Sequence, residues 1–209
     1  MKILRSYKFQ LYIFAIFILV SIVTVSYIYN TPISRFTRDP SSVMKGSQFD
    51  GFLSSIGVLF WSWTAAISFF CYALLRKSVD SSELAKFALT GGIFTSILLL
   101  DDMFMFHDDI FLRIGVNEKI VFLFYAVFLL VYLVKFRQFI LTRDYTLLLA
   151  AIFFFTFSII VDTFPYSLLG KWHHLFEDGT KFLGIVSWFG YYSSLYYQEI
   201  SLIIGKKEK

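Results

Sequence analysis

The sequence FLSSIGVLFWSWTAAISFFCYALL, residues 52–75, decides the fold class, because it carries no charged residue over its whole length. A helix needs about 20 mainly apolar residues to cross the hydrocarbon core of a bilayer. Arg76 and Lys77 follow directly and end the apolar run. This stretch therefore predicts a membrane-spanning helix.

The composition of the 209 residues supports the same class: 57% are hydrophobic, 21% aromatic and 16% charged. Soluble domains have about 45–50% apolar and about 25% charged residues. We therefore expect an integral membrane protein. The single cysteine, Cys71, excludes an internal disulfide and a multi-cysteine metal site, and its apolar setting favours an inert buried thiol.

Five further apolar runs flank this stretch, and links with turn residues or helix caps separate them. Among these links, Asn117 and Asp144 are placed to cap the helices that follow. We predict an all-α polytopic membrane protein, a bundle of six transmembrane helices in one domain over residues 1–209. The spans are expected at 11–29, 52–75, 84–106, 120–136, 145–164 and 175–204.

Six spans place both termini on one side of the membrane, and most of the 19 Lys and Arg residues fall on that side. The positive-inside rule then puts the N and C termini in the cytoplasm. We expect a cell membrane, first of all a bacterial plasma (inner) membrane. The net charge of +4 is explained by this topology, so no nucleic-acid partner is expected.

Polar residues gather at the opposite, extracytoplasmic ends of the predicted spans. The stretch LLLDDMFMFHDDI, residues 98–110, is followed far along the chain by VDTF at 161–164 and HHLFEDGTK at 173–181. Carboxylates in apolar surroundings usually face a bundle interior or a water-filled cavity. The candidate catalytic residues are Asp101, Asp102, Asp162 and Glu177, and the candidate metal ligands are His107, His173, His174 and Asp178.

Helical phase decides which of these side chains can share a site. His173, Glu177 and Lys181 lie within an arc of about 80°. By contrast, His107 points about 120–140° away from Asp101 and Asp102 on a straight helix. Either the helix frays near residue 106, or only some of these residues belong to one site; Asp108 and Asp109 are expected in the aqueous mouth.

Simpler explanations also fit parts of this pattern. Glu177 and Lys181 form an i, i+4 pair of the favourable order, which is common on helices. His173 and His174 next to Trp172 could form an interfacial belt. Asp101, Asp102 and Asp162 are harder to explain in this way, because apolar residues flank them.

Three functions fit these residues: a metal-dependent hydrolase with a lipid-like substrate, an ion or proton channel or transporter, and a non-enzymatic sensor or scaffold. A divalent metal, zinc first, is the expected cofactor of the hydrolase. Expected partners are the lipid bilayer and a lipid or small-molecule ligand, and a homo-oligomer is left open. The sequence lacks a P-loop, a nucleophile elbow, a dinucleotide glycine pattern and HExxH.

Intramembrane lipid hydrolases of the alkaline-ceramidase type also gather His and Asp at one membrane face. They have seven spans and an H-x-x-x-H pair in the last one. This chain has six predicted spans and reads H-x-x-x-E from His173 to Glu177. We therefore do not assign it to that family.

Overall fold

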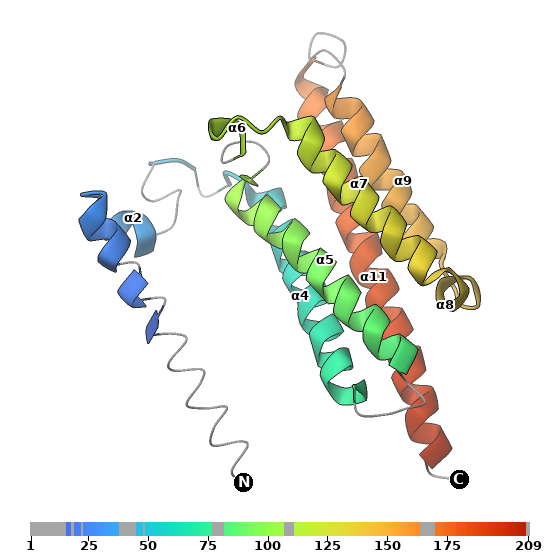
Figure 1. Ribbon diagram of the computed structural model, residues 1–209. Helices are drawn as coiled ribbons and strands as arrows, with labels where there is room; N and C mark the ends of the chain where they lie inside the picture. The colour runs from blue at the N-terminus through green and yellow to red at the C-terminus, as the bar shows by residue number, and fades with distance from the viewer. Residues whose placement is uncertain are drawn as a thin grey trace. The chain divides into compact units, whose positions relative to one another are not determined.

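The computed structural model is built from helices, with no strand among the residues it describes (Figure 1). The described residues are 16, 17, 19–21, 23–37, 45–47, 49–76, 82–106, 111–163 and 170–207. The predicted all-α class is thereby confirmed. The chain divides into two compact units, Met1–Phe52 and Leu53–Lys209. The first contains the apolar helix Leu19–Ile28 and the short helix α2 (Ser34–Thr37).

The second unit contains five long helices whose bounds agree with the predicted spans to within a few residues. They are α4 (Phe52–Leu75), α5 (Ser82–Phe104), α7 (Glu118–Lys135), α9 (Thr146–Asp162) and α11 (His173–Lys207). Three short elements connect them: α6 (Phe111–Arg113), α8 (Arg137–Leu141) and the 3-10 turn η2 (Gly170–Trp172).

Both residues predicted to cap helices accept hydrogen bonds from backbone N–H groups, although the N-cap of α9 is Tyr145, one residue after Asp144. Asn117 is the N-cap of α7, and its side-chain oxygen accepts from the N–H of Lys119. Asp144 Oδ1 accepts from the N–H of Thr146 at 2.9 Å and from its hydroxyl at 2.6 Å, just before α9. These two hydrogen bonds stabilise the ionised form and lower the pKa of the Asp144 carboxyl.

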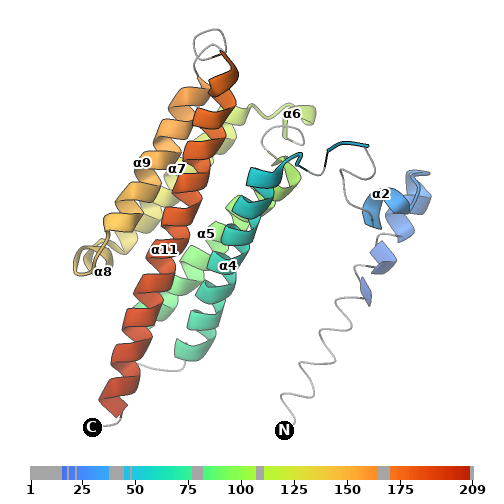
Figure 2. The same ribbon diagram turned by 180° about the vertical axis from the view of Figure 1, so that it is seen from behind.

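Helix α11 runs through the middle of the second unit, with α4 and α5 on one side and α7 and α9 on the other (Figures 1 and 2). Its buried face carries Ile185, Trp188, Tyr192 and Leu195, which recur at the three- and four-residue spacing of a helix. Because α11 supplies this stripe to the shared core, its packing holds the bundle together.

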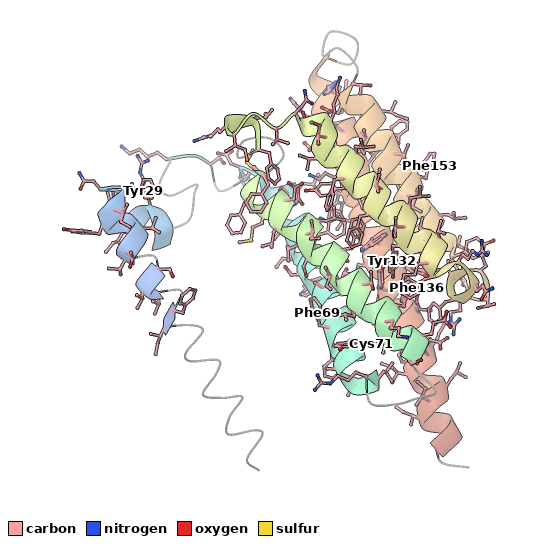
Figure 3. All side chains as sticks on the ribbon, viewed as in Figure 1. Tyr29, Phe69, Cys71, Tyr132, Phe136 and Phe153 are labelled. Atoms are coloured by element: carbon pink, nitrogen blue, oxygen red, sulfur yellow. The ribbon has the colours of Figure 1, made fainter. Side chains whose placement is uncertain are left out.

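Buried hydroxyl and indole groups connect α11 to three neighbouring helices. The Trp188 Nε1–H donates to Thr95 Oγ1 on α5 at 3.0 Å. The Tyr196 hydroxyl donates to Ser68 Oγ on α4 at 3.1 Å. The Tyr192 hydroxyl donates at 2.8 Å to that of Tyr132, which lies on α7 (Figure 3). Such interhelical hydrogen bonds add modest stability between helices in a membrane.

Glycines allow the closest approaches to α11. A Cβ added to Gly184 would lie 2.6 Å from the ring of Phe155 on α9. One added to Gly91 on α5 would lie 2.8 Å from the ring of Tyr192. Small residues at helix interfaces let backbones approach in this way, both in membranes and in tightly packed cores.

Two helices, α4 and α5, are long and apolar enough to cross a membrane, and they indicate membrane association. Helix α9 is apolar but has 17 residues, and α7 carries charges at both ends. Large apolar side chains also cover the outside of the bundle; Phe153, for example, is 62% exposed and points away from it (Figure 3). The arrangement of six spans stays a prediction.

Candidate functional site

Acidic side chains gather where four helices of the second unit meet at one end. They come from the end of α5, the start of α7, the end of α9 and the start of α11. A single cavity of about 340 Å³ contacts residues from all four ends. Its acidic lining residues are Asp101, Asp102, Glu118, Asp162, Glu177 and Asp178.

Helix α5 ends at Phe104, because Met105 adopts a positive φ of 53° that an α-helix does not accommodate. A loss of helical order near residue 106 was one of the two alternatives, and α5 ends close to it, two residues before the predicted bound of this span. Asp101 and Asp102 both belong to the last turn of α5. His107, Asp108 and Asp109 lie outside the described residues.

The last turn of α5 is held by polar partners. Asp101 is 5% exposed and accepts a hydrogen bond from the Tyr125 hydroxyl of α7. Asp102 pairs with Lys181 of α11, whose Nζ lies 2.5 Å from Asp102 Oδ1. The side chain of Asp102 is 10% exposed and that of Lys181 is 38% exposed. A half-buried ion pair thus joins α5 to α11 at the cavity.

The start of α11 brings together three side chains that could hold a metal ion. One ligand atom from each of His173, His174 and Glu177 falls within 4.8 Å of the others. Glu177 Oε2 lies 3.4 Å from Nδ1 of His173 and 3.7 Å from Nδ1 of His174. His173 is buried, Glu177 half-buried and His174 exposed. Two imidazoles and a carboxylate suit zinc.

The first turns of α11 are fixed against α9. The Ser158 hydroxyl of α9 donates to the backbone carbonyl of Glu177 at 2.9 Å. Asp162 and Asp178 lie near enough to act electrostatically on the Glu177 carboxylate. Both of these acids are exposed and line the cavity. Asp178 does not belong to the group of three that could hold the ion.

Toward the middle of the helices, aromatic side chains line the cavity beside aliphatic ones. Trp61, Phe94, Phe155 and Trp188 line it, one from each of α4, α5, α9 and α11. Trp61 stacks on Phe155 with ring centroids 5.7 Å apart, and Trp188 meets Trp61 edge-on at 6.4 Å. The Trp61 Nε1–H is buried, and the described residues supply no acceptor for it. The cavity therefore has an acidic end and, nearer the middle of the helices, four aromatic rings that we call the aromatic floor: Trp61, Phe94, Phe155 and Trp188.

A family model described as "Domain of unknown function (DUF8692)" matches residues 11–195. The chain belongs to this family. The matched region of this DUF8692 protein includes the first predicted span, α4 to α9, and α11 as far as Leu195, so it contains the whole cavity. No curated protein and no solved structure matches the chain.

The sequence alone did not identify several residues of this site in the DUF8692 protein. Glu118 begins α7 at the same end of the bundle. Its place directly after the predicted cap Asn117 was the sequence signal that could have assigned it to the site. The pairing of Lys181 with Asp102 had no local signal, since 79 positions separate the two residues. The aromatic residues of the cavity were hard to single out, because Phe occurs in every apolar run.

Proposed function

We propose that this DUF8692 protein is a metal-dependent hydrolase that acts on a lipid-like substrate from within a membrane. The observation that carries the proposal is the group His173, His174 and Glu177, with ligand atoms within 4.8 Å of one another. Catalytic zinc sites commonly use three protein ligands, including two His and one Glu, and keep the fourth position open. This donor set therefore suits catalysis better than a closed structural site.

The charges around the three ligands also favour a cation. The N-terminus of a helix is electropositive and by itself disfavours a metal ion at the start of α11. Glu177, Asp162 and Asp178 supply three carboxylates that offset this effect. A zinc ion held there supplies Lewis-acid chemistry and an activated water. Asp162 and Asp178 are then the nearby groups available to hold a proton.

The cavity supports a substrate with a large apolar part. Its volume of about 340 Å³ lies in the range of small-molecule sites, and Glu177 belongs both to its lining and to the group that could hold the metal. Beside the aromatic floor, aliphatic side chains such as Leu98, Leu129 and Ile152 line the cavity, and together they suit an acyl chain. An ester or amide near Glu177 would then place its chain toward Trp188.

The proposal includes six spans with both termini in the cytoplasm and the site facing outward. Helices α4 and α5 support it by their length and apolarity, and the charges of α7 fall at its ends. Under the positive-inside rule, the basic residues near the termini remain cytoplasmic. For this topology we propose a bacterial plasma membrane.

Movement of ions or protons is the second candidate, and the pair of Asp102 and Lys181 favours it. Charged residues buried in a membrane bundle often mark ion pathways. However, the described charged residues of the long helices lie toward the helix ends, and the buried middle offers hydroxyls such as those of Thr95 and Tyr192. A hydrolytic site at one end of the bundle needs no charged pathway through the middle. We therefore place hydrolysis before the movement of ions or protons.

The metal is tested on the purified full-length protein in an uncharged detergent. The protein is loaded with zinc, freed of excess by gel filtration and analysed by mass spectrometry of the metal. We expect about one zinc ion per chain, and at least about tenfold less in the variants His174→Ala and Glu177→Gln. Hydrolysis of a fluorogenic long-chain acyl ester should fall in parallel.

The matched control is Glu83→Gln, an exposed acid at the start of α5, which should keep both zinc and activity. Folding of every variant is checked by cooperative thermal unfolding. Folded protein without zinc would refute the metal site. Zinc bound by the three named ligands without any hydrolysis would refute the hydrolase and leave the metal site standing.

A further inference from the structure

The cavity has a chemical polarity that the proposed metal site does not use. Carboxylates line the end formed by the termini of α5, α7, α9 and α11. Four aromatic rings, of Trp61, Phe94, Phe155 and Trp188, line the part nearer the middle of the helices. A ligand that fits both parts needs a cationic group and an apolar body.

The charge balance of the described residues at the acidic end disfavours an anionic ligand. The basic residue among the described lining residues, Lys181, is already paired with Asp102. Asp162 and Asp178 are exposed to the cavity end, and neither has a basic partner among the described residues. A phosphate or carboxylate would therefore meet like charges, whereas an ammonium group would be attracted.

The aromatic floor is suited to the rest of such a molecule. Ring faces attract cations and pack against alkyl groups, and Trp is the strongest of these residues. The buried Trp61 Nε1–H has no acceptor among the described residues, so an acceptor atom on the body of an occupant, such as an ether or ester oxygen, would satisfy it. Within the aromatic floor, the rings of Trp61 and Phe155 are stacked and nearly parallel, with an interplanar angle of 13°.

We propose that the cavity binds an organic cation with an apolar body, with the ammonium group next to Asp162 and Asp178 and the body on the aromatic floor. From Glu177 to Trp188 the helix rises about 16 Å, which limits the extended length of the ligand. An alkyl chain of about eight carbons carrying a trimethylammonium group fits this length. The binding needs no metal, so it goes beyond the proposed hydrolysis.

The test uses isothermal titration calorimetry on the full-length protein in an uncharged detergent with EDTA. The probe is octyltrimethylammonium, and octyl sulfate and octanol are its anionic and neutral counterparts. We expect saturable binding of the cation, and binding of the two counterparts at least about tenfold weaker. Removal of metal by EDTA separates this result from that of the metal site.

Two variants locate the ligand. Asp162→Asn/Asp178→Asn should weaken cation binding at least about tenfold, and Phe94→Ala should weaken it without changing the preference for a cation. The control Glu83→Gln, outside the cavity, should bind like the unaltered protein. Equal binding of octyl sulfate, no saturable binding, or an unaffected double Asp variant in folded protein would each overturn the proposal.

Discussion

At the scale of single residues, Lys181 is the basic side chain among the described lining residues of the acidic end. It is the partner of Asp102, whose side chain is 10% exposed. A carboxylate this well buried depends on its counter-ion, because removal of one member of a buried pair leaves an uncompensated charge. Lys181 itself is 38% exposed, so water screens part of the interaction.

We predict that Lys181→Met lowers the free energy of unfolding by about 1–3 kcal/mol, less than for a fully buried pair because of this screening. Thermal unfolding in detergent measures the change. The double variant Asp102→Leu/Lys181→Met removes both charges and should regain most of the lost stability. A double variant that is less stable than Lys181→Met alone would show that the Asp102 carboxylate does not depend on Lys181 as its counter-ion.

At the scale of helices, the contact between α9 and α11 depends on Gly184. A Cβ at this position would lie 2.6 Å from the Phe155 ring, which is itself stacked on Trp61. Either the ring or the α11 backbone must shift. Overpacking of this kind typically costs about 1–3 kcal/mol.

Gly184→Ala should therefore lower the melting temperature, and Phe155→Leu in the same chain should restore part of it. The matched control is Gly205→Ala, also on α11, where no atom lies within 4 Å of an added Cβ. That change should be neutral or slightly stabilising, because Ala is a better helix former than Gly. Equal losses for Gly184→Ala and Gly205→Ala would show that the close contact with Phe155 does not matter.

The helices of the bundle could be predicted from the sequence, because length and apolarity define each run without knowledge of its neighbours. The run at 52–75 gave the bounds of α4, and Asn117 marked the start of α7. At residue 106 helical phase left two alternatives open; the positive φ of Met105 agrees with a helix that ends there, but His107 lies outside the described residues, so which residues share the site stays a prediction. Helix length and capping depend on neighbouring residues in the sequence, so both could be predicted from it.

The arrangement of the candidate site could be predicted from the sequence only in part. Helical phase placed His173 and Glu177 on one face, and the structure shows them 3.4 Å apart. The choice of Lys181 as partner of Asp102 depends on how α5 and α11 pack, which no local pattern encodes. Asp162 is exposed, although apolar residues precede it in the sequence. One domain, the homo-oligomer and the outward orientation stay predictions.

At the scale of the whole molecule, cysteine labelling tests the six-span topology. Cys71 is 1% exposed, and Cys71→Ala gives a background without thiols. On this background, Gly46→Cys should react with an impermeant maleimide added to intact cells, and Glu83→Cys should react only after the cells are opened. The physical reason for this expectation is the positive-inside rule, since the predicted topology has its excess of Lys and Arg on the side of the termini.

The reverse labelling would overturn the orientation and the outward-facing site together. Labelling of both positions from outside would contradict an intervening span at α4. Equal expression of the two variants, checked with a terminal tag, is the required control.

Helix α11 has 35 residues in one uninterrupted stretch without proline, and is therefore about 52 Å long. In the predicted topology α11 crosses a bilayer core of about 30 Å, and both of its ends would then reach past that core. One end carries Glu177 and Lys181, while near the other end Glu199 is paired with Arg143 at 2.6 Å. A rigid helix of this length tilts as one body. A tilt of about 5° around its middle moves each end by about 2 Å, so a displacement at the cavity would also move the end that carries Glu199.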